Sequence, residues 1–303
     1  MSTTQTPYRG RFAPSPTGPL HFGSLVTAVG SFLDARSRQG QWLVRMEDLD
    51  RTRERPGAAN QILRTLDAFG FEWDGEVVYQ SRRQGAYQDA LDALIQDSHV
   101  YACACSRRQI AQQGLPGVDG PRYAGTCRKG LAPGKAARAL RLQTHDRPVT
   151  FLDRVCGPQS QRLETDVGDF VIRRADRLFA YQLAVVVDDA WQGIDQVVRG
   201  ADLLLSSPRQ IHLQRLLSLP TPTYAHLPLV LDDAGRKLSK QSLARPVEER
   251  DPLPSLLAAL DFLGQPLPPE RPVDLQDLWR WAAENWRIGR VGCGGKKALP
   301  LIG

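Results

Sequence analysis

Along the first hundred residues the apolar positions recur with two different spacings, one typical of helices and one typical of strands. In one stretch Leu25, Val29 and Phe32 recur at helical spacing, which predicts a helix with one buried face. The segments predicted as helices are 23–38, 56–69 and 84–95, and those predicted as strands are 8–13 and 41–46. Because strands and helices alternate, we expect the strands to pair in parallel.

Residues 103 to about 165 interrupt this alternation. They hold four of the five cysteines and several stretches rich in glycine and proline, without a long periodic helix. This change of character indicates an inserted subdomain at about 103–169. Beyond it the regular pattern returns, with strands expected at 170–173 and 195–199, a helix at 203–217 and an extended segment at 223–231.

The last part of the chain is again periodic and predicts helices at 253–263 and 275–286. Residues 242–303 hold eight basic and eight acidic residues, so the excess positive charge of the chain lies before them. This distribution excludes a polybasic tail as a handle for nucleic acid. We expect the final stretch, 291–303, to be mobile.

Composition indicates a soluble globular protein. The 303 residues are 42% hydrophobic and 24% charged, which excludes disorder, collagen and coiled coil, and the length suggests about two domains. No apolar run is long enough to span a membrane, and residues 1–10 hold no signal-peptide core, so we expect a cytoplasmic protein without a membrane partner. The net charge of +6 permits a polyanionic partner without requiring one.

The stretch from Arg11 to Ser24, RFAPSPTGPLHFGS, joins a strand end to a helix start through a turn rich in proline and glycine. Such a junction can present backbone amides and the positive end of a helix to phosphate. Taken alone, the turn is unremarkable and a single His21 at a helix start is more often structural.

A second motif, KLSKQ, follows more than 200 residues later and holds Lys237 and Lys240, two of only six lysines in the chain. A loop with two lysines after Gly235 suits a mobile clamp on the charge that develops at a transferred phosphorus. In this order the two motifs resemble the two signatures of class I aminoacyl-tRNA synthetases.

Three further stretches narrow the resemblance to the glutamyl branch: LVRMEDLD at 43–50, YQLAVVVDD at 181–189 and VVRGADLL at 197–204. Together the motifs resemble the glutamyl-tRNA synthetase catalytic core over residues 8 to 241. The resemblance implies an α/β fold whose Rossmann-type parallel sheet carries a zinc-bearing insertion and is followed by a short helical C-terminal subdomain. Ser24, Leu238 and Gln241 depart from the class signatures, but both lysines are kept.

The resemblance also assigns roles to individual residues. It implies glutamate binding by five residues and ATP binding by four, with His21 and Lys240 acting on the phosphates. The glutamate set is Arg11, Ser15, Glu47, Tyr181 and Arg199, and the ATP set is His21, Gly23, Lys237 and Lys240. These roles fit the charges, because an arginine fork suits the side-chain carboxylate and Glu47 with Tyr181 suits the α-ammonium. Mg²⁺ is expected as the companion of ATP.

An odd number of cysteines disfavours a disulfide framework and favours reduced thiols or a metal. Three thiols within about 25 residues, Cys103, Cys105 and Cys127, suggest one structural Zn²⁺. Spacing alone leaves the fourth ligand open among His99, His145 and Cys156. The resemblance implies Tyr123 instead, and we expect Cys156 and Cys293 to be buried or incidental thiols.

Only 62 residues follow Gln241, too few for the anticodon-binding domain of roughly 100 to 150 residues that ends a full glutamyl-tRNA synthetase. We therefore expect a catalytic domain at 1–240, a short helical region at 241–303 and no anticodon-binding domain. This pattern resembles the truncated paralogues that activate glutamate and transfer it to the queuosine base in the anticodon stem-loop of tRNA(Asp). Oligomeric state stays open, with a monomer favoured.

Three alternatives remain. The nearest is a shortened glutamyl-tRNA synthetase that charges a tRNA 3′ end. A non-catalytic RNA-binding paralogue is disfavoured because Arg11, His21, Glu47, Arg199 and Lys240 are all present. A small-molecule adenylyltransferase would share the fold and the histidine and lysine motifs, but it does not need Arg11 and Arg199 to bind a glutamate carboxylate.

Overall fold

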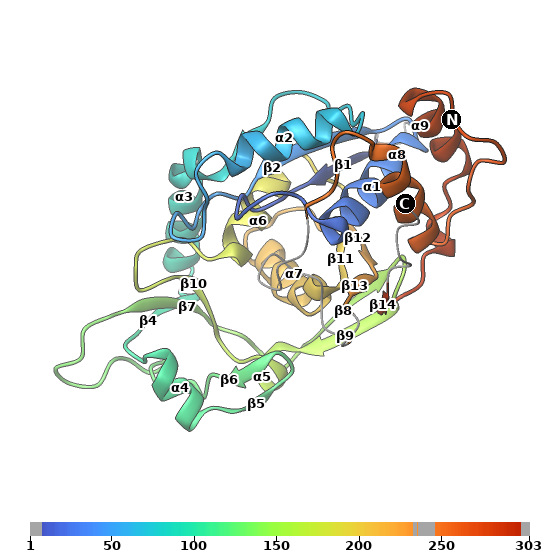
Figure 1. The fold of residues 1–303 in the computed structure, drawn as a ribbon. Coiled ribbons are helices and arrows are strands. Elements are labelled where there is room, and N and C mark those ends of the chain that lie inside the picture. Colours follow the sequence, from blue (N-terminus) through green and yellow to red (C-terminus); the bar gives the residue numbers. More distant parts are fainter. Residues whose placement is uncertain (1–7, 233–234, 236–245, 298–303) are drawn as a thin grey trace, which may run out of the picture.

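A computed structural model describes residues 8–232, 235 and 246–297. Its first three strands form a parallel sheet in the order β1-β2-β3, with α1 crossing between the first two (Figure 1). These elements are β1 (Arg9–Phe12), α1 (Phe22–Arg36), β2 (Gln41–Met46) and β3 (Val78–Tyr79). The predicted strands, helix and parallel pairing are confirmed here.

A second parallel pair lies next to the first. β11 (Gln196–Gly200) pairs with β12 (Thr223–Leu227), with Val197 opposite Tyr224. β11 also runs beside β1, because the amide of Asp195 donates to the carbonyl of Arg9 at 3.1 Å. The two sheets therefore lie side by side at β1 and β11, as expected for a Rossmann-type arrangement.

The other helices of this part are α2 (Ala58–Ala68), η1 (Gln80–Arg82), α3 (Gln84–Gln96), α6 (Tyr181–Trp191), η2 (Ala201–Ser206) and α7 (Ser207–Leu216). The helix expected at 203–217 is split, because its first residues form the 3₁₀ turn η2 and the α-helix begins only at Ser207. Pro208 lies in the first turn of α7, where its missing N–H is tolerated. Gly30 brings α1 close to β12, since a Cβ there would lie 2.5 Å from Leu227 Cδ1.

The inserted segment forms its own small elements, drawn in green in Figure 1. They are β4 (Val100–Cys103), α4 (Arg107–Gln113), β5 (Leu115–Gly117), β6 (Gly120–Arg122), β7 (Ala139–Leu142), β8 (Pro148–Asp153), β9 (Gly157–Arg162), α5 (Leu163–Asp166) and β10 (Phe170–Arg173). β10 pairs antiparallel with β7. The strand expected at 170–173 is therefore present but does not join the parallel strands, because the apolar pattern that identified it does not specify its partner.

The second half of the insertion returns to the main sheet. β8 and β9 form an antiparallel hairpin, and the end of β8 pairs in parallel with β12 through Asp153 and Tyr224. The sheet order is β11-β12-β8-β9. The hairpin thus extends the sheet that carries β11.

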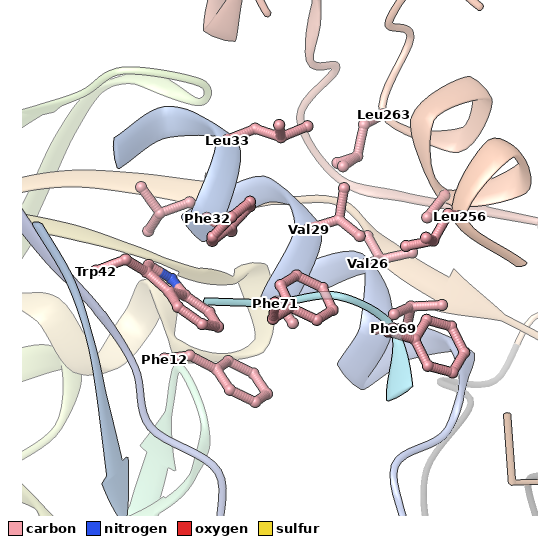
Figure 2. Packing of buried hydrophobic residues seen from close by; sticks show 14 of the residues in the cluster. Phe12, Val26, Val29, Phe32, Leu33, Trp42, Phe69, Phe71, Leu256 and Leu263 are labelled. Carbon is pink, nitrogen blue, oxygen red and sulfur yellow. The ribbon is translucent and has the colours of Figure 1, made fainter. Parts of the chain in front are cut away.

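The C-terminal helices α8 (Pro252–Phe262) and α9 (Leu275–Asn285) occupy the predicted places. They share one core with β1, α1 and β2, and η4 (Ile288–Arg290) follows them. In Figure 2 Phe32 lies among Trp42, Phe71 and the α1 side chains. Its ring makes edge contacts with Trp42 at 5.2 Å, with Phe71 at 5.3 Å and with Trp279 of α9 at 4.9 Å. The C-terminal helices therefore stabilise the sheet rather than forming a core of their own.

The end of the described chain is tied to the rest of the fold by a strand pair and a disulfide. β14 (Gly295–Lys297) pairs in parallel with β13 (Leu229–Leu231), and Cys293 forms a disulfide with Cys156 in the turn between β8 and β9. The expectation that Cys156 and Cys293 are buried or incidental thiols is wrong. The odd cysteine count misled because a bonded pair and a separate triad also give five. Of the tail expected to be mobile, residues 298–303 lie outside the described part.

Within residues 8–232, 235 and 246–297 we find no helix that combines the length and the hydropathy needed to cross a membrane.

Candidate active site

One cavity of about 950 Å³ opens where β1, β2 and β11 end. It is lined by seven of the nine residues assigned to glutamate and ATP: Arg11, Ser15, His21, Gly23, Glu47, Tyr181 and Arg199. Parallel strands bring the residues after their carboxyl ends to one edge, which explains how positions far apart in sequence meet there. The other two, Lys237 and Lys240, lie outside the described residues.

His21 is the N-cap of α1 and also lines the cavity. The amide of Ser24 donates to its Nδ1 at 3.3 Å, and its side chain is 9% exposed. Ser24, which stands where the class signature has a second histidine, thus fixes the imidazole ring at the helix start. Gly23 follows in the first turn, where a positive helix end faces the cavity.

Arg11 is paired with a carboxylate, Asp189, that the sequence analysis did not select. Its Nε lies 3.1 Å from Asp189 Oδ1 and its Nη2 3.2 Å from Oδ2, both buried. Asp189 also accepts from Arg45 Nη2 at 2.7 Å. Burial opposes the Asp189 carboxylate, but Arg11 and Arg45 outweigh it and hold its pKa below the usual value. Arg11 is therefore held rigidly, with part of its charge already paired.

Arg45 is fully buried and connects this pair to a second carboxylate. Its Nη1 donates to Gln192 Oε1 at 2.6 Å, and its Nε lies 3.9 Å from Asp188 Oδ2. Asp188 in turn accepts from Tyr87 at 2.7 Å and from Arg83 at 2.6 Å. This network holds Arg11 in place on the cavity wall. Three of its members, Arg45, Asp188 and Asp189, lie in the stretches 43–50 and 181–189 that carried the family resemblance.

Glu47 lies beside the network with its side chain 10% exposed and its Oε1 buried, and the network does not satisfy that oxygen. Its Oε1 is 3.7 Å from Arg45 Nη2, and within the described residues it accepts no hydrogen bond. Burial raises the pKa of Glu47 to about 7, and the attraction of Arg45 and Arg11 only partly offsets this. Burial, with a contribution from the charge of Glu47, raises the pKa of Tyr181 to about 12. An unsatisfied carboxylate on the cavity wall is suited to an ammonium group.

Arg199 differs from Arg11 in its partners. It is 4% exposed, and its nitrogens donate to His226 Nε2 at 3.0 Å, Gln210 Oε1 at 2.8 Å and Ser207 Oγ at 2.8 Å. Each of these acceptors is uncharged, so they orient the guanidinium without pairing its charge. Of the two arginines, Arg199 is the stronger attractor for a ligand carboxylate.

Two further cavity residues were missed by the sequence analysis. Arg53 and Arg55 follow β2 on an exposed turn and line the same cavity. No motif marks them in a chain this rich in arginine. Their positive charge makes the mouth of the cavity attractive to phosphate.

The cysteine triad is assembled in the insertion. The sulfur atoms of Cys103, Cys105 and Cys127 lie within 4.8 Å of one another, and Cys103 and Cys127 are buried. The hydroxyl of Tyr123 lies 3.5 Å from Cys103 Sγ and 3.9 Å from Cys105 Sγ. The structure thus brings the four predicted ligands together, and none of the earlier alternatives, His99, His145 or Cys156, belongs to this group.

The spacing fits a tetrahedral ion. Metal–sulfur bonds of about 2.3 Å separate two sulfur ligands by about 3.8 Å, and a metal–oxygen bond of about 2.0 Å gives a sulfur–oxygen separation of about 3.5 Å. The observed values are 3.7 Å between Cys105 and Cys127 and 3.5 Å between Cys103 and Tyr123. Arg141 Nε donates to Cys103 Sγ at 3.3 Å and supplies positive charge beside the thiols. The cluster can therefore hold a metal.

Comparison with known proteins agrees with this geometry. Residues 8–261 match the family described as tRNA synthetases class I (E and Q), catalytic domain. The chain is 59% identical over 289 residues to a glutamyl-Q tRNA(Asp) synthetase of Dechloromonas aromatica, covering 94% of this chain and 96% of that protein. It is 56% identical over 294 residues to a protein of the same name from Chromobacterium violaceum, covering 97% and 98%.

Solved structures show the same fold. A glutamate tRNA ligase from Elizabethkingia meningosepticum, in complex with its amino acid, superimposes with a TM-score of 0.78 at 22% identity, over 97% of this chain and 67% of that one. A glutamate-tRNA synthetase from Elizabethkingia anophelis gives 0.76 at 22% identity, over 95% and 67%. Taken with the family match and the near full-length relatives, the chain belongs to the class I tRNA synthetases (E and Q), and within them to the glutamyl-Q tRNA(Asp) synthetases.

Proposed function

We propose that the protein activates glutamate with ATP to glutamyl-adenylate and transfers the glutamate to the queuosine base in the anticodon stem-loop of tRNA(Asp). The observation that carries the activation step is the charge pattern of the cavity. Among the described residues, Oε1 of Glu47 accepts no hydrogen bond and the guanidinium of Arg199 forms no ion pair with a carboxylate. The acceptor rests on the names of the relatives, at 51–59% identity over 93–97% of this chain.

The amino acid is oriented by opposite charges on the cavity wall. Glu47 and Tyr181 receive the α-ammonium, and Arg199 receives the side-chain carboxylate. Arg11 uses Nε and Nη2 on Asp189, so a ligand would meet its Nη1. Ser15 lies between β1 and α1 on the same wall. Glutamine would leave the charge of Arg199 unpaired, which costs several kcal/mol in a desolvated pocket and favours glutamate.

ATP occupies the part of the cavity near the start of α1. His21 and Gly23 contact the phosphates. Lys237 and Lys240 of the KLSKQ motif supply positive charge to the same phosphates. An oxygen of the glutamate α-carboxylate attacks the α-phosphorus, the bond to the bridging oxygen breaks, and pyrophosphate leaves with the electron pair. Lys240 stabilises the charge on the transferred phosphorus, and Mg²⁺ accompanies ATP. No protein nucleophile is needed, because positioning and charge stabilisation suffice.

Cys103, Cys105, Tyr123 and Cys127 would hold one Zn²⁺. Thiolate ligands and tetrahedral spacing favour zinc over magnesium or calcium, and the ion would stabilise the insertion without taking part in the reaction. Burial raises the pKa of the Tyr123 phenol well above its usual value, so Tyr123 is the ligand least ready to ionise.

We place residues 1–240 in a catalytic domain, with the insertion at about 103–169, and 241–303 in a short helical region. The expected location is the cytoplasm, with its tRNA.

The function is tested with labelled glutamate and ATP, offered with tRNA(Asp) that carries queuosine, with tRNA(Asp) that carries guanosine instead, and with tRNA(Glu). The proposal predicts glutamate-dependent exchange of pyrophosphate into ATP and labelling of the queuosine-containing tRNA alone. Labelling of tRNA(Glu) would identify a shortened conventional synthetase. Exchange without any labelling would show that the acceptor is wrong while the activation step is right.

A further inference from the structure

A line of three buried polar side chains runs from the β8–β9 hairpin to the cavity. Asp153 lies at the end of β8, His226 in β12 and Arg199 in β11, and they are 2%, 0% and 4% exposed. Asp153 Oδ2 lies 2.6 Å from His226 Nδ1, and His226 Nε2 lies 3.0 Å from Arg199 Nε. The chemistry of these groups fixes which atom donates in each bond.

The Asp153 carboxylate can only accept, so His226 must carry its proton on Nδ1. Its Nε2 then has a free lone pair and accepts from the guanidinium of Arg199, which can only donate. The opposite tautomer would direct an N–H of His226 at an N–H of Arg199. Burial lowers the pKa of His226 to about 4, which keeps the ring neutral at physiological pH, although the bond to Asp153 works the other way.

Asp153 is itself held firmly. Its Oδ1 accepts from the amides of Cys156 at 2.8 Å, Val155 at 3.0 Å and His226 at 3.2 Å. Burial opposes its charge, but the bonds from His226 and from the turn outweigh this and hold its pKa below the usual value. The carboxylate is therefore ionised, and its position is set by the hairpin that the insertion contributes to the main sheet.

Asp153 and His226 orient the guanidinium of Arg199 without neutralising its positive charge. The imidazole of His226 separates the Asp153 carboxylate from the Arg199 guanidinium. Arg11, in contrast, is contacted directly by the carboxylate of Asp189. Gln210 and Ser207 hold the two other nitrogens. A guanidinium that is fixed in direction and still uncompensated is what discrimination between a carboxylate and an amide requires.

We propose that Asp153 and His226 are positioning residues for Arg199, and that they set the preference of the site for glutamate over glutamine. The inference rests on the proposed role of Arg199 in binding the side-chain carboxylate. It gives the β8–β9 hairpin of the insertion a part in amino-acid selection.

Asp153→Asn and His226→Asn test the inference by different changes. An amide at 153 can donate to Nδ1 and thereby stabilise the tautomer that repels Arg199. Asparagine at 226 can still bond Asp153 but is too short to reach Arg199. In both variants we expect KM for glutamate in pyrophosphate exchange to rise about tenfold or more, with KM for ATP unchanged and the preference for glutamate over glutamine reduced.

His212 provides the matched control. It is 3% exposed, its Nε2 lies 3.1 Å from the carbonyl of Gln143, and among the described residues no hydrogen bond joins it to Arg199. His212→Asn removes an equally buried imidazole, so it should lower thermal stability and leave the glutamate-to-glutamine preference unchanged. If it shifts that preference as much as His226→Asn does, the effect is general loosening and the inference is wrong.

Nitrogen-15 NMR of histidine-labelled protein gives a readout independent of activity. The signals that disappear in His226→Asn identify His226, and we expect a protonated Nδ1 and an unprotonated Nε2 near pH 7 in the unmodified protein. A protonated Nε2 would overturn the inference even if a variant failed to fold. If Arg199→Ala leaves KM for glutamate unchanged, the proposed role of Arg199 fails instead. If Arg199→Ala raises it and the two positioning variants do not, only this inference fails.

Discussion

Replacing Glu47 by glutamine should make the protein more stable at alkaline pH and less able to bind glutamate. The side chain is only 10% exposed, and its buried Oε1 accepts no hydrogen bond within the described residues. Its pKa is raised from 4.5 to about 7, a difference that corresponds to about 3 kcal/mol against the ionised form.

The sign follows from the proton balance. Between pH 4.5 and about 7 the folded protein keeps a proton on Glu47 that the unfolded chain releases, so this group makes the free energy of unfolding fall as pH rises through that interval. Above pH 7 the loss is complete. Glu47→Gln removes it, so we expect the variant to gain about 3 kcal/mol over the unmodified protein at pH 8 and less than about 1 kcal/mol at pH 5.

Glutamate binding should change in the opposite direction. The α-ammonium needs the ionised carboxylate, so in the unmodified protein KM for glutamate should rise below pH 7, by up to about tenfold per pH unit. In Glu47→Gln it should be raised about tenfold to a hundredfold at pH 8 and should no longer depend on this ionisation.

Urea unfolding at pH 5 and pH 8 and pyrophosphate exchange between pH 5.5 and 8.5 measure both effects. Glu76→Gln, at an exposed position before β3, is the matched control and should change neither quantity. The reasoning is refuted if Glu47→Gln is less stable than the unmodified protein at pH 8, or if its KM for glutamate equals that of Glu76→Gln.

The remaining predictions concern ATP, zinc and the disulfide. Lys240→Ala should lower the turnover of glutamate activation far more than it weakens glutamate binding, since its contact matters most in the transition state, and exchange kinetics with unchanged turnover would remove Lys240 from the mechanism. Cys103→Ser should lower the zinc bound after dialysis and destabilise the insertion, and full zinc content would mean that the ligands are wrong. Thiol titration in denaturant with chelator should find three free thiols before reduction and five after, because Cys156 and Cys293 are bonded, and five before reduction would contradict the disulfide. Cys293→Ser should lower the free energy of unfolding by at most about 5 kcal/mol, as denaturation curves would show, since the bond closes a loop of 137 residues.

The local elements could be predicted because each depends on the pattern within a short stretch. That the site residues lie close together could be predicted from the order of these elements and from the motifs. Apolar periodicity predicts α1, and the alternation of strand and helix predicts the parallel pairing of β1 with β2. Parallel pairing then places Ser15 and Glu47, which follow those strands, at one edge. The motifs supplied the remaining residues of the cavity by resemblance.

The partners of buried charges could not be predicted in this way. Arg11 and Asp189 are 178 positions apart, and His226 and Asp153 are 73 apart on strands from the main sheet and the insertion. Hydrophobic patterning shows which side of an element is buried, but it does not show which buried charge faces which. The pairing of β10 with β7 and the bond between Cys156 and Cys293 could not be predicted either, because the sequence pattern does not show which distant strand or cysteine is the partner.

The position of the transferred glutamate on the tRNA tests the central claim most directly. Queuosine-containing tRNA(Asp) is labelled with glutamate, and the 3′-terminal nucleotides are then removed before the anticodon fragment is isolated. The account predicts that the label stays with the anticodon fragment and that tRNA(Asp) with guanosine at that position takes none. Label that leaves with the 3′ end, or equal labelling of the two tRNAs, would contradict it.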